Sequence, residues 1–275
     1  MSLLRRYHES RLTNLEVQER KYIMSKRKLT KTIFFIVFAL VVALATQGVD
    51  FIKNNITPEP NPSATEPDAP FKTHKASYNL SNIPEFTDEP YVIINDNQPS
   101  FTDEEIERGK TSFQEFSDLD ELLRCGTAFA SVGQDLMPTE ERESIGMIKP
   151  SGWQTVRYDD LIEDKYLYNR CHLIGYQLTG QNANEYNLIT GTRYLNVTGM
   201  LPFENEIANY VKHTGNHVLY SVTPIFENDN LVASGVLMEA KSIEDNGEGV
   251  CFCVYCYNEQ PGITIDHKTG NSERK

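Results

Sequence analysis

The sequence predicts an α+β fold in which helices pack on a central antiparallel sheet. Three strand-like runs with short polar breaks between them follow one another near the C-terminus: 217–226, 231–243 and 249–257. Two further strand-like runs, 153–158 and 166–173, lie close together earlier in the chain. One long helical pattern, Leu195–Lys212, separates the two groups. Strands joined by short turns pair antiparallel, and a helix with an apolar stripe needs a sheet face to cover.

The first half of this fold begins with a helical pattern. Residues 101–123 mix acidic and apolar side chains at helical spacing, and Thr102-Asp103-Glu104-Glu105 is typical of a helix start. Residues 153–158 then alternate like a strand, after a turn at Ser151-Gly152. The run 166–173 predicts a second strand, which carries Arg170 and His172. Because side chains alternate between the faces of a strand, these two point the same way.

A polar stretch, 175–185, predicts a loop before the main helix. That helix covers Leu195–Lys212, and Gly215 is a natural stop for it. Asn196 and Glu204 lie eight residues apart on it, slightly over two turns, so one helix face can carry both.

The strands after this helix form a predicted hairpin. The turn is Asn228-Asp229-Asn230, between the runs 217–226 and 231–243. The run 249–257 adds a further strand. We expect strand, loop and helix to converge on one cleft.

The charge of the chain is unevenly distributed. The formal net charge is -13; residues 1–31 carry nine Lys/Arg against three Asp/Glu, which leaves 17 against 36, or -19, in the remainder. Affinity for nucleic acid normally comes from Lys and Arg that displace counterions, so an acidic body counts against a polyanionic partner. A local basic groove and a divalent cation can offset this.

The N-terminal region predicts export. An apolar run, Ile33–Ala45, follows the basic stretch from Met24, as in a signal sequence, and Ala43-Leu44-Ala45 fits a cleavage site. A cleaved signal and an uncleaved membrane anchor both remain open, and both leave the body outside the cell. A buried core helix is the third alternative. Met24 begins a more typical signal than Met1, so residues 1–23 are a cytoplasmic tail or an extension from a misassigned start.

These observations give five predicted segments. They are a basic segment (1–31), a signal peptide or anchor (32–49), a disordered tether rich in Pro, Asn and Thr (50–84), a compact domain (85–260) and a polar, frayed tail (261–275). The cysteines, at 125, 171, 251, 253 and 256, are odd in number, which outside the cell leaves one unpaired or bridging chains. Buried thiols are the simplest interpretation; a disulfide involving Cys125 or Cys256 and a zinc site in the 251–256 run are alternatives.

The segment Asn169-Arg170-Cys171-His172, with Asn187, Asn196 and Glu204 that follow it, brings together the groups that phosphodiester hydrolysis requires. His172 can act as a general base, because its ordinary pKa near 6.5 suits proton abstraction at neutral pH. Arg170 can hold a phosphate with its guanidinium group. Asn196 offers a hard oxygen ligand for Mg²⁺, which keeps several waters and takes few protein ligands, and Glu204 can assist through water. Asn187 can position the histidine, the substrate or the loop.

These residues, with Asn187-Leu188-Ile189-Thr190, Asn196 and Phe203-Glu204-Asn205, resemble the DRGH-type DNA/RNA non-specific endonucleases of the ββα-metal fold. Within that family the chain is most similar to membrane-bound DNA-entry nucleases of streptococci and related secreted DNases. The resemblance implies that His172 is the general base and Asn196 the direct Mg²⁺ ligand, with Mn²⁺ as an alternative metal. It further implies that Glu204 holds a metal-bound water, Arg170 stabilises the transition state and Asn187 orders the site. Arg193 is a further expected substrate contact.

Two positions depart from the DRGH pattern, because Asn169 stands for Asp and Cys171 for Gly. Neither change removes the base or the metal ligand. The sequence therefore predicts an exported or membrane-anchored Mg²⁺-dependent endonuclease that acts on DNA, with RNA as a second candidate substrate. The resemblance implies a bacterial source. The alternative is a surface-tethered binding module for nucleic acid or protein with weak or lost activity. His213 and His217 are expected to be surface residues, because Gly215 interrupts the helix that a metal-binding histidine pair requires.

Overall fold

The computed structural model describes residues 74–76 and 83–275. The predicted basic segment and the predicted signal or anchor, together residues 1–49, lie outside the described residues, as does most of the predicted tether. Within the described part of the chain, no helix has the length and apolar character needed to cross a membrane.

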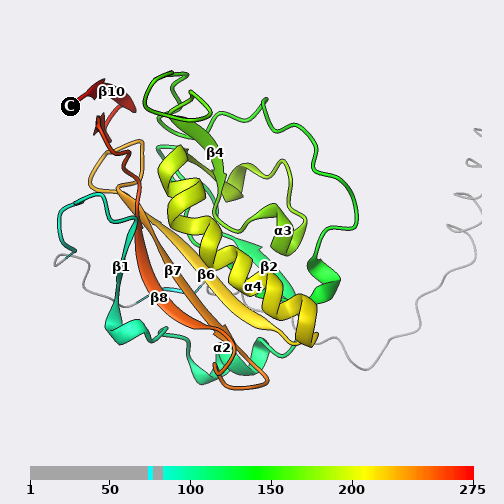
Figure 1. Ribbon diagram of the computed structural model, residues 1–275. Coiled ribbons are helices and arrows are strands. Elements are labelled where there is room, and N and C mark those ends of the chain that lie inside the picture. Colours follow the sequence, from blue (N-terminus) through cyan, green and yellow to red (C-terminus); the bar gives the residue numbers. More distant parts are fainter. Residues whose placement is uncertain (1–73, 77–82) are drawn as a thin grey trace, which may run out of the picture. The chain divides into compact units, whose positions relative to one another are not determined.

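A six-stranded sheet forms the centre of the fold (Figure 1). Its order is β1-β8-β7-β6-β3-β2, and every neighbouring pair is antiparallel. The strands are β1 (Tyr91–Ile93), β2 (Phe113–Phe116), β3 (Ala128–Val132), β6 (Val218–Ile225), β7 (Gly235–Ser242) and β8 (Cys251–Tyr257). The predicted α+β class with a central antiparallel sheet is confirmed. The predicted hairpin is the β6–β7 pair, although its loop is longer than the three-residue turn expected.

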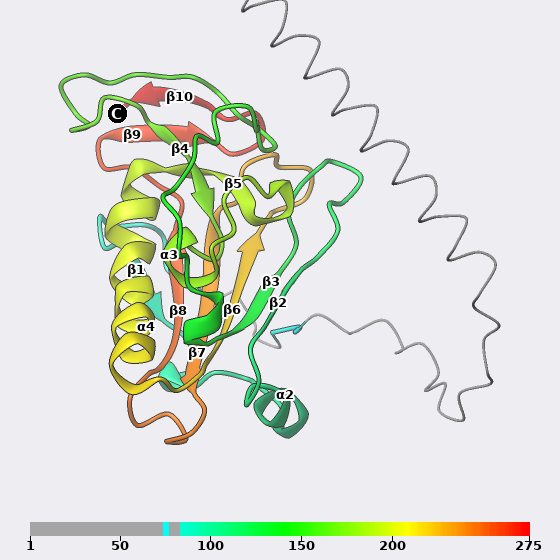
Figure 2. The same cartoon turned by 90° about the vertical axis from the view of Figure 1, so that its right-hand side faces the viewer.

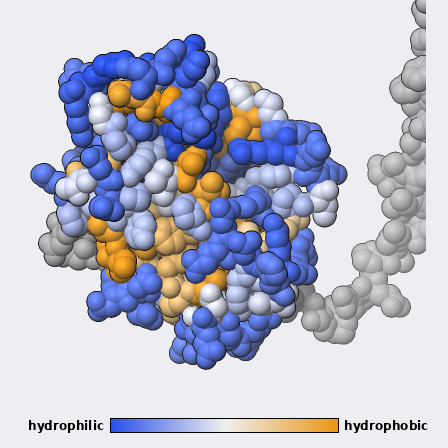
Figure 3. Space-filling model, viewed as in Figure 1, coloured by the Kyte–Doolittle hydropathy of each residue, from blue (hydrophilic) through white to orange (hydrophobic). Residues whose placement is uncertain are grey.

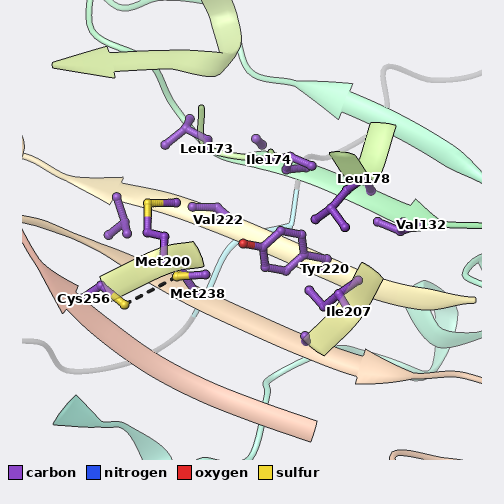
Figure 4. Close-up of a cluster of buried hydrophobic side chains, with 14 of the residues drawn as sticks. Val132, Leu173, Ile174, Leu178, Met200, Ile207, Tyr220, Val222, Met238 and Cys256 are labelled. Carbon is purple, nitrogen blue, oxygen red and sulfur yellow. Dashed lines mark hydrogen bonds between the residues drawn. The ribbon is translucent and has the colours of Figure 1, made fainter. Parts of the chain in front are cut away.

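The helix α4 (Leu201–Thr214) covers one face of this sheet (Figures 1 and 2). Its buried side includes Ile207 and Val211, which belong to the same core as Tyr220 of β6 and Met238 of β7. Figure 4 shows Ile207 beside Tyr220, and Met200 at the start of the helix near Met238. This burial, rather than helix propensity alone, holds α4 on the sheet.

A separate two-stranded pair lies next to this core. β4 (Tyr168–His172) pairs antiparallel with β5 (Leu188–Thr192), and between them the chain forms α3 (Tyr176–Thr179) and a 3₁₀ turn, η4 (Glu185–Asn187). A π-helical segment, η5 (Leu195–Met200), then leads into α4. The order strand, strand, helix is the ββα arrangement that the resemblance implies. The single α-helix expected over Leu195–Lys212 is thus a π-turn followed by an α-helix.

The C-terminal residues form a hairpin, so the expectation of a frayed tail after Pro261 is wrong. β9 (Ile263–Asp266) pairs with β10 (Asn271–Arg274), and Ile263 and Ile265 are buried in a second apolar cluster. That cluster also contains Leu167 and Tyr168, which lead into and begin β4. Alternate apolar residues in a short polar stretch therefore fasten the C-terminus beside β4 (Figure 2).

Two predicted elements are shorter than expected. The helical pattern over 101–123 yields only α2 (Asp103–Arg108), which Thr102 and Glu105 begin with a reciprocal capping box. Phe113–Phe116 then becomes β2, because pairing with β3 overrides helical spacing. The run 153–158 contributes one isolated bridge, Arg157 with Tyr166, rather than a strand. Two 3₁₀ turns, η2 (Asn95–Asn97) and η3 (Gln134–Leu136), complete the described elements.

The predicted tether reaches further into the fold than its composition indicates. His74 is 4% exposed, and its ring nitrogens lie 2.8 Å from Glu105 and 3.0 Å from Glu239. All five cysteines are free thiols, and among the described residues no group of three or more His, Cys, Asp or Glu side chains is arranged for a metal. The disulfide alternative is thus not realised in this structure.

Candidate active site

A cavity of about 370 Å³ lies where β4, the turn after it, η5 and α4 meet. Five of the six residues singled out by the sequence line it: Arg170, His172, Arg193, Asn196 and Glu204. An adjoining cavity of about 580 Å³ shares Arg170, Arg193 and Asn196 with it and adds Trp153 and Asn169. Figure 3 shows that hydrophilic side chains cover most of the face that carries α4, with smaller apolar patches between them.

His172 is held at the end of β4 with one ring nitrogen fixed. Nε2 lies 2.8 Å from the backbone carbonyl of Asn182, which can only accept, so Nε2 carries the proton. Nδ1 then presents a lone pair, 3.3 Å from a guanidinium nitrogen of Arg142. Burial, together with the charge of Arg142, lowers the pKa of His172 to about 4, against the opposing effect of the Asn182 carbonyl. The imidazole is therefore neutral at pH 7, as a general base must be.

Three arginines line the same cavity as this histidine. Arg170 donates to the carbonyls of Gly146 (2.8 Å) and Ile148 and lies 4.1 Å above the ring of Trp153. Arg193 forms an ion pair with Asp164. Arg142 comes from the irregular loop between η3 and β4, and it lines both cavities.

Asn196 lies in the π-helical segment η5, with both ends of its carboxamide engaged. Nδ2 donates to Oδ1 of Asn169 at 3.0 Å. Oδ1 accepts from the thiol of Cys171, at a Sγ–Oδ1 distance of 3.3 Å. A carbonyl oxygen has two lone pairs, so Oδ1 keeps one acceptor position for a further partner.

Glu204 is an acidic side chain on the buried face of α4. It is 8% exposed and accepts a hydrogen bond from the backbone N–H of Gly175. Burial raises the pKa of the carboxyl to about 7, against the effects of that hydrogen bond and of Arg142. A Cβ atom at Gly175 would lie 2.6 Å and 2.7 Å from the two carboxylate oxygens, so only glycine leaves Glu204 its place.

Comparison with known proteins agrees with this geometry. Residues 106–244, half of the chain, match the DNA/RNA non-specific endonuclease family. The chain belongs to this family. It is therefore a nuclease, an enzyme of the hydrolase class, and the family, fold class and enzyme class predicted from the sequence are confirmed.

Two solved structures are similar to this nuclease. NucA from Streptococcus agalactiae with a magnesium ion bound is 24% identical, with a TM-score of 0.62, over 71% of this chain and 92% of that one. At this identity the similarity establishes the fold. Sda1 nuclease with a bound zinc ion is 27% identical, with a TM-score of 0.50, over 59% of this chain and 81% of that one. Among curated proteins, none matches the chain.

Asn187 is the one expected site residue of the nuclease that lies outside both cavities. It is 0% exposed, and its carboxamide forms two hydrogen bonds of 2.9 Å with the backbone N–H and C=O of Ile174. Its own backbone carbonyl accepts from Leu173 at 2.9 Å. Asn187 therefore clamps the chain immediately after His172 and sets the direction in which β4 ends.

The donor set of the site fits a hard divalent cation. Asn196 and Glu204 line one cavity and offer a carboxamide and a carboxylate oxygen, the ligand types that Mg²⁺ prefers. Glu204 is a buried acid with one backbone donor, and a cation nearby would offset the cost of ionising it. The acidic and amide oxygens here are too few for a closed protein cage, which agrees with an ion that keeps most of its waters.

Sequence reasoning missed three contributors to the site. Arg142 lies 30 residues before His172 in a loop without regular pattern, so no periodicity relates the two. Gly175 has an ordinary φ of -59°, so its backbone does not require glycine. Glycine is needed there because the Glu204 carboxylate lies too close for a Cβ atom, which only the folded structure reveals. Asn182 acts through its backbone carbonyl, which carries no residue-type signal.

Proposed function

We propose that this nuclease is an Mg²⁺-dependent endonuclease with little sequence preference that hydrolyses phosphodiester bonds of DNA, with RNA as a further substrate. The observation that carries the proposal is the convergence of a neutral, oriented histidine, three arginines and a carboxamide–carboxylate pair on one cavity. Export is part of the proposal, and it rests on the apolar run Ile33–Ala45 after a basic stretch.

His172 takes the proton from the attacking water. Its lone pair is on Nδ1, because Asn182 fixes the proton on Nε2, and its lowered pKa keeps that lone pair free at neutral pH. Arg142 lies against the same nitrogen, so a phosphate that enters the cavity competes for its guanidinium group and frees Nδ1 for water.

Arginines supply the recognition of the substrate. Arg142, Arg170 and Arg193 line both cavities, and a guanidinium group binds two phosphate oxygens at once. In a body with a formal charge of -19, this local cluster provides the positive field that the whole molecule lacks. Contacts to phosphate alone carry no sequence information, which agrees with a non-specific enzyme.

Asn196 would hold the metal directly, and Glu204 would hold one of its waters. The chemistry that a divalent cation would supply there is neutralisation of charge on the phosphoryl oxygens and stabilisation of the leaving oxygen. Asn169 and Gly175 orient these two ligands, the first through the Asn196 amide and the second through the Glu204 carboxylate.

The test compares the parent with His172→Ala on supercoiled plasmid, with Mg²⁺ and with EDTA. Loss of a general base lowers the rate by about 10²–10⁴. His213→Ala is the matched control, because His213 is exposed at the C-terminal end of α4, where its ring hydrogen-bonds to the Asn209 carbonyl, and it lines neither cavity. A parent that nicks no plasmid in Mg²⁺, or a His172→Ala variant as active as the parent, would refute the proposal in favour of a binding module. Assays with single-stranded DNA and with RNA under the same conditions define which nucleic acids are substrates.

A further inference from the structure

Asn196 is held by two contacts that differ in kind. Oδ1 of Asn169 accepts a hydrogen bond from the Asn196 NH₂ group. The Asn169 carboxamide could also rotate and donate from its own NH₂ group, so this contact alone does not fix the orientation of the Asn196 amide. The thiol of Cys171 offers one S–H donor, and the Asn196 oxygen at 3.3 Å is nearer than its other two acceptors, Met200 Sδ at 3.5 Å and the His172 carbonyl at 3.7 Å. The S–H donor of Cys171 therefore fixes the orientation of the Asn196 carboxamide, with its oxygen toward Cys171.

Cys171 itself is immobile. It is 0% exposed on β4, in the core of the molecule. Gly191 of β5 leaves room for it, because a Cβ atom at 191 would lie 2.5 Å from the Cys171 Cβ and 3.2 Å from its Sγ.

We propose that Cys171 is a positioning residue for the metal site. Its thiol fixes the Asn196 carboxamide with the oxygen toward Cys171 and leaves the second lone pair of that oxygen for a divalent cation. This inference rests on the proposed function, in which Asn196 is the direct ligand. It predicts that metal affinity depends on a buried side chain that does not touch the metal.

The chain offers a matched control in Cys256. Both thiols are 0% exposed, and both belong to the same core. Each lies 3.5 Å from a methionine sulfur: Cys171 from Met200, and Cys256 from Met238. Figure 4 shows the Cys256–Met238 contact. Only Cys171 contacts Asn196. Removing either sulfur costs similar packing, so a difference in metal affinity between the two alanine variants is due to the Cys171–Asn196 hydrogen bond.

The experiment measures binding of Mg²⁺ by calorimetry and of Mn²⁺ by electron paramagnetic resonance to the full chain and to Cys171→Ala, Cys171→Ser and Cys256→Ala. Loss of a residue that orients a metal ligand weakens affinity about tenfold or more, so we expect this for Cys171→Ala. Cys171→Ser keeps a donor and is expected to stay within about threefold of the parent. Cys256→Ala is expected to bind as the parent does, and the metal-induced rise in melting temperature should follow the same order.

Three outcomes would overturn the positioning role while leaving the nuclease proposal intact. They are parent-like affinity in Cys171→Ala, an equal loss in Cys171→Ala and Cys256→Ala, and a loss in Cys171→Ser as large as in Cys171→Ala. If Cys171→Ala does not fold, Cys171→Val, which fills the space better but offers no hydrogen-bond donor, replaces it in the same comparisons. A parent that binds metal but nicks no plasmid refutes the proposed function and not the coupling of Cys171 to Asn196.

Discussion

Glu204, a proposed site residue, differs in chemistry from the apolar residues around it. It occupies a position on the core side of α4, between residues that pack on the sheet, yet it carries an acid. An ionised carboxylate in such a place is costly, which is why its pKa is raised to about 7. The Gly175 N–H donor offsets part of this cost, and a cation in the cavity, as proposed, would offset more of it.

The raised pKa of Glu204 predicts a pH-dependent stability in metal-free protein. The folded value of about 7 lies above the ordinary 4.5, so the folded state holds the proton longer, and stability falls as pH rises from about 4.5 through 7. Glu204→Gln cannot ionise and escapes this loss. Relative to the parent, it should gain roughly 1–3 kcal/mol between pH 5 and pH 8 in urea denaturation with EDTA. Glu248→Gln, on an exposed loop, is the control; a gap for Glu204→Gln that stays constant with pH would contradict the assignment.

At the scale of elements, the turn between β4 and α3 joins the proposed base, His172, to the proposed metal-site residue Glu204. His172 ends β4, Asn187 clamps Ile174, and Gly175 starts α3 against Glu204. These contacts lie within a few residues of one another, so the turn fixes the end of β4 relative to Glu204 on α4. The geometry of the site therefore depends on this turn as much as on the side chains that line the cavity.

Gly175→Ala tests that dependence. The φ of -59° suits alanine, so any cost comes from the close approach of Cβ to the Glu204 carboxylate. We expect a loss of roughly 1–3 kcal/mol in stability, most of which disappears when Glu204 is also changed to Ala. Gly180→Ala, at a φ of 64°, should cost about the same in both backgrounds, because its strain lies in the backbone. Additive losses for Gly175→Ala and Glu204→Ala would show that the two do not interact.

The elements also show what periodicity can and cannot predict. Strand alternation places Arg170 and His172 on one side of β4, and the helical pattern finds α4, because both are local. The π-turn that carries Asn196 was not foreseen, since one extra residue per turn leaves no mark in the spacing of apolar residues. The C-terminal hairpin was missed because Ile263 and Ile265 become a buried face only when Leu167 and Tyr168 lie beneath them.

On the scale of the whole molecule, the acidic body and the anionic substrate oppose each other. The charge of the described domain repels DNA at long range, and three arginines in two adjoining cavities must act at short range. A protein that binds DNA through a broad basic surface loses affinity steeply with salt, whereas one that uses a small cluster loses less. A divalent cation at the proposed Asn196–Glu204 site would add a further short-range contact without adding basic residues.

This balance predicts a shallow salt dependence of DNA binding. The measurement uses the His172→Ala variant, so that binding is separated from cleavage. A plot of the logarithm of DNA affinity against the logarithm of salt concentration should have a slope of magnitude about 1–3, because each neutralised phosphate contributes about 0.9. Arg193→Ala should lower affinity for all sequences alike and reduce the slope by about 1. Arg274→Ala is the matched control, because Arg274 also pairs with an aspartate of the same loop, Asp160, but lies outside both cavities. Fluorescence anisotropy at several KCl concentrations gives the slopes. A slope steeper than about 6, or an equal effect of the two variants, would place the main phosphate contacts elsewhere on the molecule.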